Sequence, residues 1–189
     1  MPSPHDVAVL VGSLRKGSFT RQMAVALTRL APSHLSFRFV EIGGVALYNQ
    51  DLDTDAPPPS WRTLRDDIRA SDAVLFATPE YNRSVPGVLK NAIDVASRPY
   101  GKSAFERKPA AILSVSPGAI GGFGANHHLR QSLVFLGMPA MAQPEAYIGH
   151  ANDLLDANGE LKNEGTRKFL ADFAAAFAAW IELHAGVLR

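Results

Sequence analysis

The chain has 189 residues, of which 47% are hydrophobic and 20% charged, and its formal net charge is +1 at pH 7. This composition is typical of one folded domain, residues 1–189, and excludes a disordered chain. The near-neutral charge argues against nucleic acid as a partner, and no apolar run reaches the roughly 18 residues that a membrane span needs. Because there is no cysteine, thiol redox chemistry is excluded, and any electron transfer requires a bound cofactor.

Apolar runs and helical spacing alternate along the chain. Four apolar runs and a weaker fifth predict strands at 7–12, 35–42, 73–79, 110–116 and 139–149. Between them, apolar residues recur at spacings of three and four, which predicts helices. These residues are Met23, Leu27 and Leu30; Trp61, Leu64 and Ile68; Leu129, Leu133 and Leu136; and Phe169, Phe173, Phe177 and Trp180. Ser60 is expected to cap the helix that contains Trp61.

Buried strands that alternate with helices predict an α/β protein with helices on both faces of a parallel sheet. Five such units in this length favour a flavodoxin-like, doubly wound, five-stranded parallel sheet of order 2-1-3-4-5. In that order the winding reverses between strands one and three, and ligands bind there, beyond the carboxyl ends of the strands. The loops at 12–21, 78–87 and 116–124 are therefore the candidate site.

The first of these loops, GSLRKGSFTR, has the composition of an anion-binding site. A Walker loop is excluded because no Lys-Ser/Thr pair follows the second glycine, and two glycines make a poor dinucleotide fingerprint, although Glu41 could imitate the ribose-binding acid. A cradle of hydroxyl groups and helix N-terminal amides fits better, with Ser13, Ser18 and Thr20 as donors and Arg15 as the cation. Such a cradle suits one terminal phosphate monoester. The alternative is that Ser18 or Thr20 only caps the helix.

The other two loops follow strands three and four. In TPEYNRSVPGVLKNAID, two prolines end a strand and begin a helix, and Glu80, Tyr81 and Asn82 between them expose amides and a carboxamide. This arrangement suits a flat heteroaromatic ring, although Tyr81 alone could equally pack over a helix end. In SPGAIGG the glycines permit close approach of the backbone to a ring, and Ser116 is either part of the site or a turn residue.

Other polar groups favour structural roles. His127 and the histidine after it are expected to face solvent or a subunit, because no cysteine or acidic cluster accompanies them as metal ligands. Asp66 and Asp67, beside Arg65 and Arg69, are expected to lie on the outer face of a helix as solvated charge. No metal site is expected, and no residue is assigned to acid–base catalysis.

The motifs quoted above, with SRP, HLRQ and PEAYIG, resemble the NAD(P)H-dependent FMN reductase family, including its quinone and chromate reductases, from Val7 to about Trp180. The resemblance implies a flavodoxin-like fold and one non-covalent FMN per subunit. It implies that the FMN phosphate is held by Ser13, Arg15, Ser18, Phe19 and Thr20. It implies that the isoalloxazine is held by Pro79, Glu80, Tyr81, Asn82 and the loop of Ser116 and Gly118.

The resemblance also implies an activity. NADPH or NADH would reduce the FMN, which would pass electrons to quinones or other small acceptors, including chromate or azo compounds. It implies homodimers, often paired into tetramers. Alternatives are a flavin reductase that supplies reduced FMN to an oxygenase and a flavodoxin-type electron carrier, which the near-neutral charge disfavours. Val95, Arg83 and Thr20 depart from the family pattern. The chain start lacks the basic region of a signal peptide, so a cytoplasmic location is expected.

Overall fold

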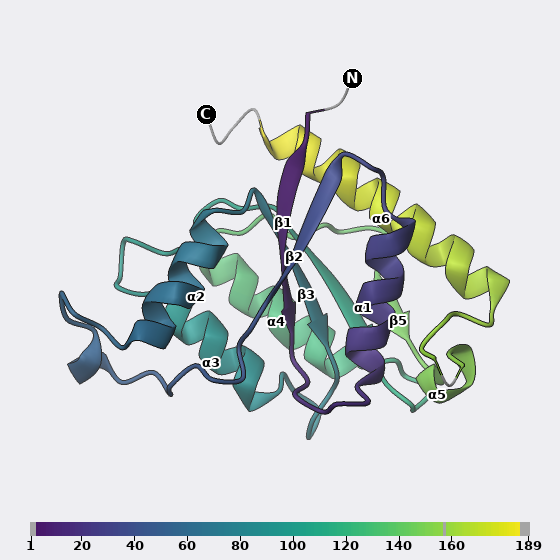
Figure 1. Cartoon of the computed structure of the whole chain (residues 1–189), viewed down its shortest axis with the longest axis horizontal. Helices are drawn as coiled ribbons and strands as arrows, with labels where there is room; N and C mark the ends of the chain where they lie inside the picture. Colours follow the sequence, from purple (N-terminus) through teal and green to yellow (C-terminus); the bar gives the residue numbers. More distant parts are fainter. Residues whose placement is uncertain (1–2, 157, 186–189) are drawn as a thin grey trace.

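The computed structural model describes residues 3–156 and 158–185 and contains a five-stranded sheet with helices on both faces (Figure 1). The strands are β1 (His5–Val11), β2 (Leu35–Val40), β3 (Ala73–Thr78), β4 (Ala110–Val115) and β5 (Ala146–Ile148). They are ordered β2-β1-β3-β4-β5, and every neighbouring pair is parallel. The predicted flavodoxin-like order is confirmed.

Two sets of helices cover the sheet. Figure 1 shows α1 and α6 on one side and α2, α3 and α4 on the other. The bounds are α1 (Phe19–Leu30), α2 (Pro59–Arg69), α3 (Gly87–Ala96), α4 (Phe123–Phe135), α5 (Ala151–Leu154) and α6 (Glu164–Ala185), with a short 3-10 turn at Gln50–Leu52. Within residues 3–156 and 158–185, no helix is both long and apolar enough to cross a membrane. Because all strands run in one direction, the loops after β1, β3 and β4 lie at the same edge of the sheet.

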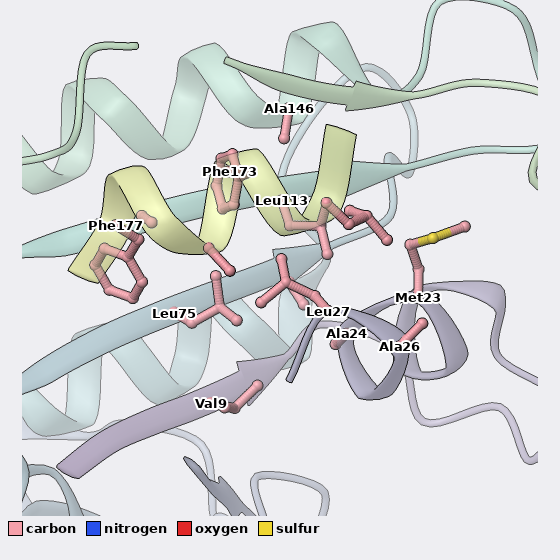
Figure 2. Close-up of a cluster of buried hydrophobic side chains, with 14 of the residues drawn as sticks. Val9, Met23, Ala24, Ala26, Leu27, Leu75, Leu113, Ala146, Phe173 and Phe177 are labelled. Atoms are coloured by element: carbon pink, nitrogen blue, oxygen red, sulfur yellow. The ribbon is translucent and has the colours of Figure 1, made fainter. Parts of the chain in front are cut away.

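Alternate residues of the central strands supply two separate cores. In β3, Leu75 packs with α1 and α6, whereas Phe76 packs with α2, α3 and α4. Both faces of each central strand are therefore buried, which explains why these strands appear in the sequence as continuous apolar runs. Figure 2 shows the first core, where the sheet meets α1 and α6 through Val9, Leu75, Leu113, Met23, Leu27, Phe173 and Phe177.

The fifth strand is shorter than the predicted run at 139–149. Only Ala146–Ile148 pairs with β4, and upstream of it Ala140 makes a single bridge to Ala110. The residues between them include Pro144, which has no N–H to donate to a sheet and so favours an interruption of the strand at this point.

The start of α2 differs from the prediction. The helix begins at Pro59 with Pro58 as its N-cap, and no side chain caps it. Proline is tolerated there because the first N–H groups of a helix have no intrahelical partner. The hydroxyl of Ser60 instead accepts a hydrogen bond from the Ala46 N–H at 3.4 Å. The predicted Ser60 cap is wrong.

The charges on α2 are divided between solvent and core. Asp66 and Arg69 form an exposed pair at 3.1 Å, as expected. Arg65, which follows Trp61 by one helical turn, lies on the buried face and is only 4% exposed. Its Nη2 donates to Asp53 Oδ1 at 2.9 Å and its Nε donates to the Val95 carbonyl at 3.0 Å. The expectation that Arg65 lies on the outer face is wrong.

Candidate functional site

The loop between β1 and α1 presents donors at a helix N-terminus. Ser18 is the N-cap of α1, and its buried Oγ accepts a hydrogen bond from the Arg21 N–H at 3.2 Å. Ser18 therefore does cap the helix, but this uses only an acceptor lone pair and leaves its O–H able to donate. Phe19 and Thr20 form the first turn, where backbone N–H groups have no intrahelical partner. The buried Ser18 and Thr20 hydroxyls and these N–H groups form one side of a candidate binding site for an anion, the anion cradle.

Arg15 adds charge to this cradle. Its Nη2 donates to the Gly17 carbonyl at 2.6 Å, and its guanidinium lies 5.3 Å from the centre of the Phe19 ring. Within the described parts of the chain, Arg15 forms no ion pair with a carboxylate, so its charge is not neutralised. The positive end of the α1 dipole acts at the same place. Together with the hydroxyl of Ser13 at the loop start, this is the donor set that a phosphate monoester requires.

A glycine brings this loop close to the loop after β3. The N–H of Gly12 donates to the carbonyl of Ala77, the neighbouring residue in β3, at 2.8 Å. A Cβ on Gly12 would lie 3.1 Å from Leu89 Cδ2 and 3.3 Å from Pro79 Cδ. A larger residue would require Leu89 and Pro79 to shift by a few tenths of an ångström, so Gly12 permits the close approach of the first loop to Pro79.

The residues after Pro79 form a tight hairpin. Tyr81 and Ser84 exchange backbone hydrogen bonds of 3.1 and 3.0 Å. The two residues between them have positive φ, 51° at Asn82 and 63° at Arg83, which is the pattern of a type I′ turn. The Asn82 side chain and the Tyr81 ring are exposed at the carboxyl edge of the sheet. This geometry leaves both side chains able to contact a ligand.

The Glu80 side chain is directed at α4 rather than into the loop. Its Oε2 accepts a hydrogen bond from the Ala125 N–H at 3.1 Å, and its Oε1 lies 3.3 Å from Arg83 Nη1. A Cβ on Gly124 would lie 2.9 Å from Glu80 Oε2, so glycine is needed for this contact. The carboxylate of Glu80 thus stabilises the N-terminus of α4, and Glu80 offers a ligand mainly its backbone.

The two adjacent histidines hold neighbouring elements. His128 Nδ1 lies 2.9 Å from Ser84 Oγ and so joins α4 to the hairpin, while His127 Nε2 lies 3.1 Å from the Tyr147 hydroxyl. Burial, with the Glu145 carboxylate adding to it, raises the pKa of Tyr147 to about 12. Tyr147 therefore remains protonated at neutral pH. His128 is exposed as expected, but both histidines have protein partners that the sequence did not indicate.

The loop after β4 is folded against β5. The Oγ of Ser116 accepts a hydrogen bond from the Gly118 N–H at 3.1 Å, so Ser116 is a turn residue whose O–H can still donate. Gly121 has φ 66°, and a Cβ there would lie 2.6 Å from the carbonyl carbon of Tyr147. The close approach that Gly121 permits is thus to β5 and not to a ring. Gly118 is exposed at the edge of the sheet, where its backbone is accessible.

Asn91 is a buried polar residue whose structural role sequence reasoning missed. It is buried on α3, where its Oδ1 accepts a hydrogen bond from the Tyr48 N–H at 2.9 Å and its Nδ2 donates to the carbonyls of Val45 and Ala46, each at 3.2 Å. The indole of Trp61 also donates to the Ala46 carbonyl, at 2.8 Å. These contacts hold the segment 45–48, after β2, against α2 and α3. The available signal was a polar residue on the apolar face of a predicted helix.

A doubly wound parallel sheet with an anion cradle where its winding reverses defines a mononucleotide-binding protein of the flavodoxin class. The model of the NADPH-dependent FMN reductase family matches residues 5–153, so the chain belongs to that family. It is an oxidoreductase with FMN as its cofactor and NAD(P)H as its electron donor. The predicted family, enzyme class and cofactor are confirmed.

Individual relatives are similar over almost their whole length. A quinone reductase of Pseudomonas putida KT2440 is 60% identical over 187 residues, which cover 99% of this chain and 100% of the relative. A 2-hydroxy-1,4-benzoquinone reductase of a Burkholderia species is 51% identical over 175 residues, 93% of this chain and 95% of the relative. The solved structure of FerB, an NAD(P)H:(acceptor) oxidoreductase flavoenzyme from Paracoccus denitrificans, is 47% identical and superposes with a TM-score of 0.89, covering 95% of this chain and 98% of that chain.

Proposed function

We propose that the protein is an NAD(P)H:quinone oxidoreductase that uses FMN held at the carboxyl edge of its sheet. The anion cradle at the N-terminus of α1, next to the exposed hairpin after β3, is the observation that carries this proposal. The names of the Pseudomonas and Burkholderia relatives support quinones as the class of acceptor. Other small oxidants, such as chromate or azo compounds, are further acceptors of the same proposal.

The cradle and the two other loops would bind different parts of the cofactor. Ser13, Arg15, Ser18, Phe19 and Thr20 would hold the phosphate, for which their hydroxyl groups, first-turn amides and free guanidinium are suited. Pro79, Glu80, Tyr81, Asn82, Ser116 and Gly118 would hold the ring system. Of these, Glu80 and Gly118 would act through their backbone, because the Glu80 carboxylate is bound to α4 and Gly118 has no side chain.

Bound FMN supplies the redox chemistry, which is acceptance of hydride from the nicotinamide and reduction of the acceptor. The loops after β3 and β4 would bind and orient the ring system at the exposed carboxyl edge of the sheet. Both substrates would react at this edge in turn, which predicts ping-pong kinetics. No side chain is assigned to proton transfer. Tyr147, with its pKa raised to about 12 by burial, is not a base at neutral pH.

The chain is further proposed to act as one unit, residues 1–189, in the cytoplasm and as a homodimer, with dimers pairing into tetramers. Val134 and Phe135 on α4 are 78% and 73% exposed, next to a groove of about 250 Å³ between α3 and α4. Neighbouring large apolar side chains of this kind are typical of an interaction surface, which supports the proposed homodimer. Without cysteine the chain forms no disulfide, so it does not depend on an oxidising compartment.

The purified protein tests this function directly. We expect a yellow protein whose heat-released flavin is FMN rather than FAD, because the cradle can hold one terminal phosphate. It should oxidise NADH or NADPH rapidly only when a quinone is added. Turnover that needs excess free FMN instead of quinone would indicate a supplier of reduced flavin. Bound FMN that neither coenzyme reduces would indicate an electron carrier.

A further inference from the structure

A second concave site lies beside the phosphate cradle, between the first loop and the end of β2. Its volume is about 320 Å³. Ser18, Phe19 and Thr20, which form the helix side of the cradle, do not line it. The lining residues are Val11, Ser13, Leu14, Arg15, Lys16 and Arg21 from the first βα unit and Val40, Glu41 and Ile42 from the end of β2.

One wall of this pocket is apolar. Leu14 is 58% exposed and packs over Gly43. A Cβ on Gly43 would lie 3.0 Å from Leu14 Cδ2, so the two residues are in close contact. Val40 and Ile42 are buried beneath the pocket. Such a wall suits the face of a planar base.

The opposite side of the pocket has an excess of positive charge. Lys16 forms no ion pair with residues 3–156 or 158–185, and Arg15 donates only to a backbone carbonyl. Arg21 Nη1 lies 3.8 Å from Glu41 Oε1, too far for a hydrogen bond, and the two side chains are 46% and 81% exposed. Exposed pairs of this kind contribute little to stability. Three cations and one carboxylate thus meet at a concave surface, and without Arg15, which is assigned to the FMN phosphate, the pocket still has two cations and one carboxylate, which favours an anionic ligand.

The position of the pocket indicates which ligand this is. In dinucleotide-binding α/β folds, the adenosine ribose lies at the end of the second strand, where an acid binds its 2′-hydroxyl or an arginine accommodates a 2′-phosphate. Glu41 and Arg21 occupy that place here. NADPH is longer than FMN, so a coenzyme with its nicotinamide at the loops after β3 and β4 can place its adenosine end beyond the cradle, next to β2.

We propose that this pocket binds the adenosine 2′-phosphate end of NADPH, with Lys16 and Arg21 on the phosphate and Leu14 against the adenine. The enzyme consequently prefers NADPH to NADH, and Glu41 limits the preference because it repels the 2′-phosphate. This inference rests on the proposed function in one respect, which is that the electron donor of the enzyme is a nicotinamide coenzyme. Arg15, between the cradle and the pocket, stays with the FMN phosphate.

Binding of coenzyme fragments to the FMN-loaded protein tests the pocket without turnover. By calorimetry, adenosine 2′,5′-bisphosphate should bind the wild type at least about tenfold more tightly than 5′-AMP, the effect expected of one charge-assisted contact. Arg21→Ala and Lys16→Ala should each remove most of this difference and leave the FMN content unchanged. Arg62→Ala, an exposed arginine on α2 outside the pocket, is the matched control and should bind both fragments as the wild type does.

Steady-state kinetics provide the second measurement. Arg21→Ala should lower kcat/KM for NADPH by about tenfold and for NADH by less than about twofold, whereas Glu41→Gln should raise it for NADPH only. Equal losses with both coenzymes would overturn the proposal, as would a wild type that prefers NADH. Inorganic phosphate could displace the bisphosphate while 5′-AMP binds no more tightly than phosphate does. This result would reveal an anion site without adenosine recognition and would also overturn the proposal. If the protein binds the bisphosphate as expected but turns over neither coenzyme, the proposed function is refuted and the proposal for the pocket is still supported.

Discussion

The side chain of Asn82 extends from a turn whose backbone alone favours asparagine. Both central residues of the turn have positive φ, a conformation that asparagine adopts more readily than most residues. A role in the turn and a role in ligand binding therefore select the same residue type. The sequence identified Asn82 as a candidate contact but could not separate the two roles, because φ is not visible in a sequence.

Replacing Asn82 by glycine separates them. Glycine keeps the positive φ at no steric cost, so Asn82→Gly removes the side chain and preserves the turn, whereas Asn82→Ala also strains the backbone. We expect Asn82→Gly to weaken FMN binding by about 1–3 kcal/mol, the cost of an unpaired buried polar group. The pH–rate profile should keep its shape because a carboxamide does not titrate. Titration of the apo-variants with FMN is the measurement, and full affinity in Asn82→Gly would reduce the role of the residue to the turn.

Arg15 and Lys16 are adjacent cations for which different ligands are proposed. Arg15 folds over the N-terminal turn of α1, so Arg15→Ala should weaken FMN binding by about 1.5–3 kcal/mol. Lys16 lines the second pocket, and Lys16→Ala should leave the FMN affinity within a few tenths of a kcal/mol of the wild type, the range of a solvated charge. Fluorescence titration of both apo-variants compares them, and equal affinities would mean that Arg15 does not contact the phosphate.

At the scale of elements, the hairpin after β3 is fastened to α4 by Glu80. Glu80→Ala removes the acceptor for the Ala125 N–H and should lower the free energy of unfolding by about 1 kcal/mol, as loss of a helix cap does. Glu80→Gln keeps an oxygen acceptor and should cost less. Arg83→Ala is the control, since Arg83 is 78% exposed and its pair with Glu80 contributes little. Urea unfolding followed by circular dichroism gives these values, and an Arg83→Ala effect as large as that of Glu80→Ala would assign the stabilisation to the ion pair.

The elements whose bounds could be predicted from the sequence are the strands that are buried on both faces. The three central strands, β1, β3 and β4, start and end within about two residues of their apolar runs, because burial of both faces excludes most polar residues from them. Contacts between distant segments could not be predicted. The carboxylate of Glu80 meets α4 45 residues further on, and Asn91 holds a segment 43 to 46 residues earlier. Composition and periodicity contain no information on such pairs, so the loops of the site were predictable and the direction of their side chains was not.

At the scale of the whole molecule, the helices on the two sides of the sheet differ in the apolar residues that they expose. The outer surface of α4 carries Val134 and Phe135, both largely exposed and adjacent to the groove against α3. On the other side of the sheet, α6 carries the exposed Leu183. One exposed leucine is ordinary for a surface, whereas neighbouring large apolar residues beside a groove favour association. A homodimer is therefore expected to form through α3 and α4, and α6 is expected to remain at the outside.

Charged substitutions on the two sides of the sheet test this assembly. Phe135→Asp would place a carboxylate in an apolar contact, where an unpaired charge is strongly unfavourable, so the variant should be monomeric at concentrations at which the wild type is dimeric. Leu183→Asp, 68% exposed on α6, introduces the same charge and should leave the dimer intact. Light scattering coupled to size-exclusion chromatography measures the mass of each protein, and thermal unfolding checks that both variants fold. A monomeric wild type would refute the dimer itself. Dissociation by Leu183→Asp alone would instead move the interface to α6, on the opposite side of the sheet from the groove.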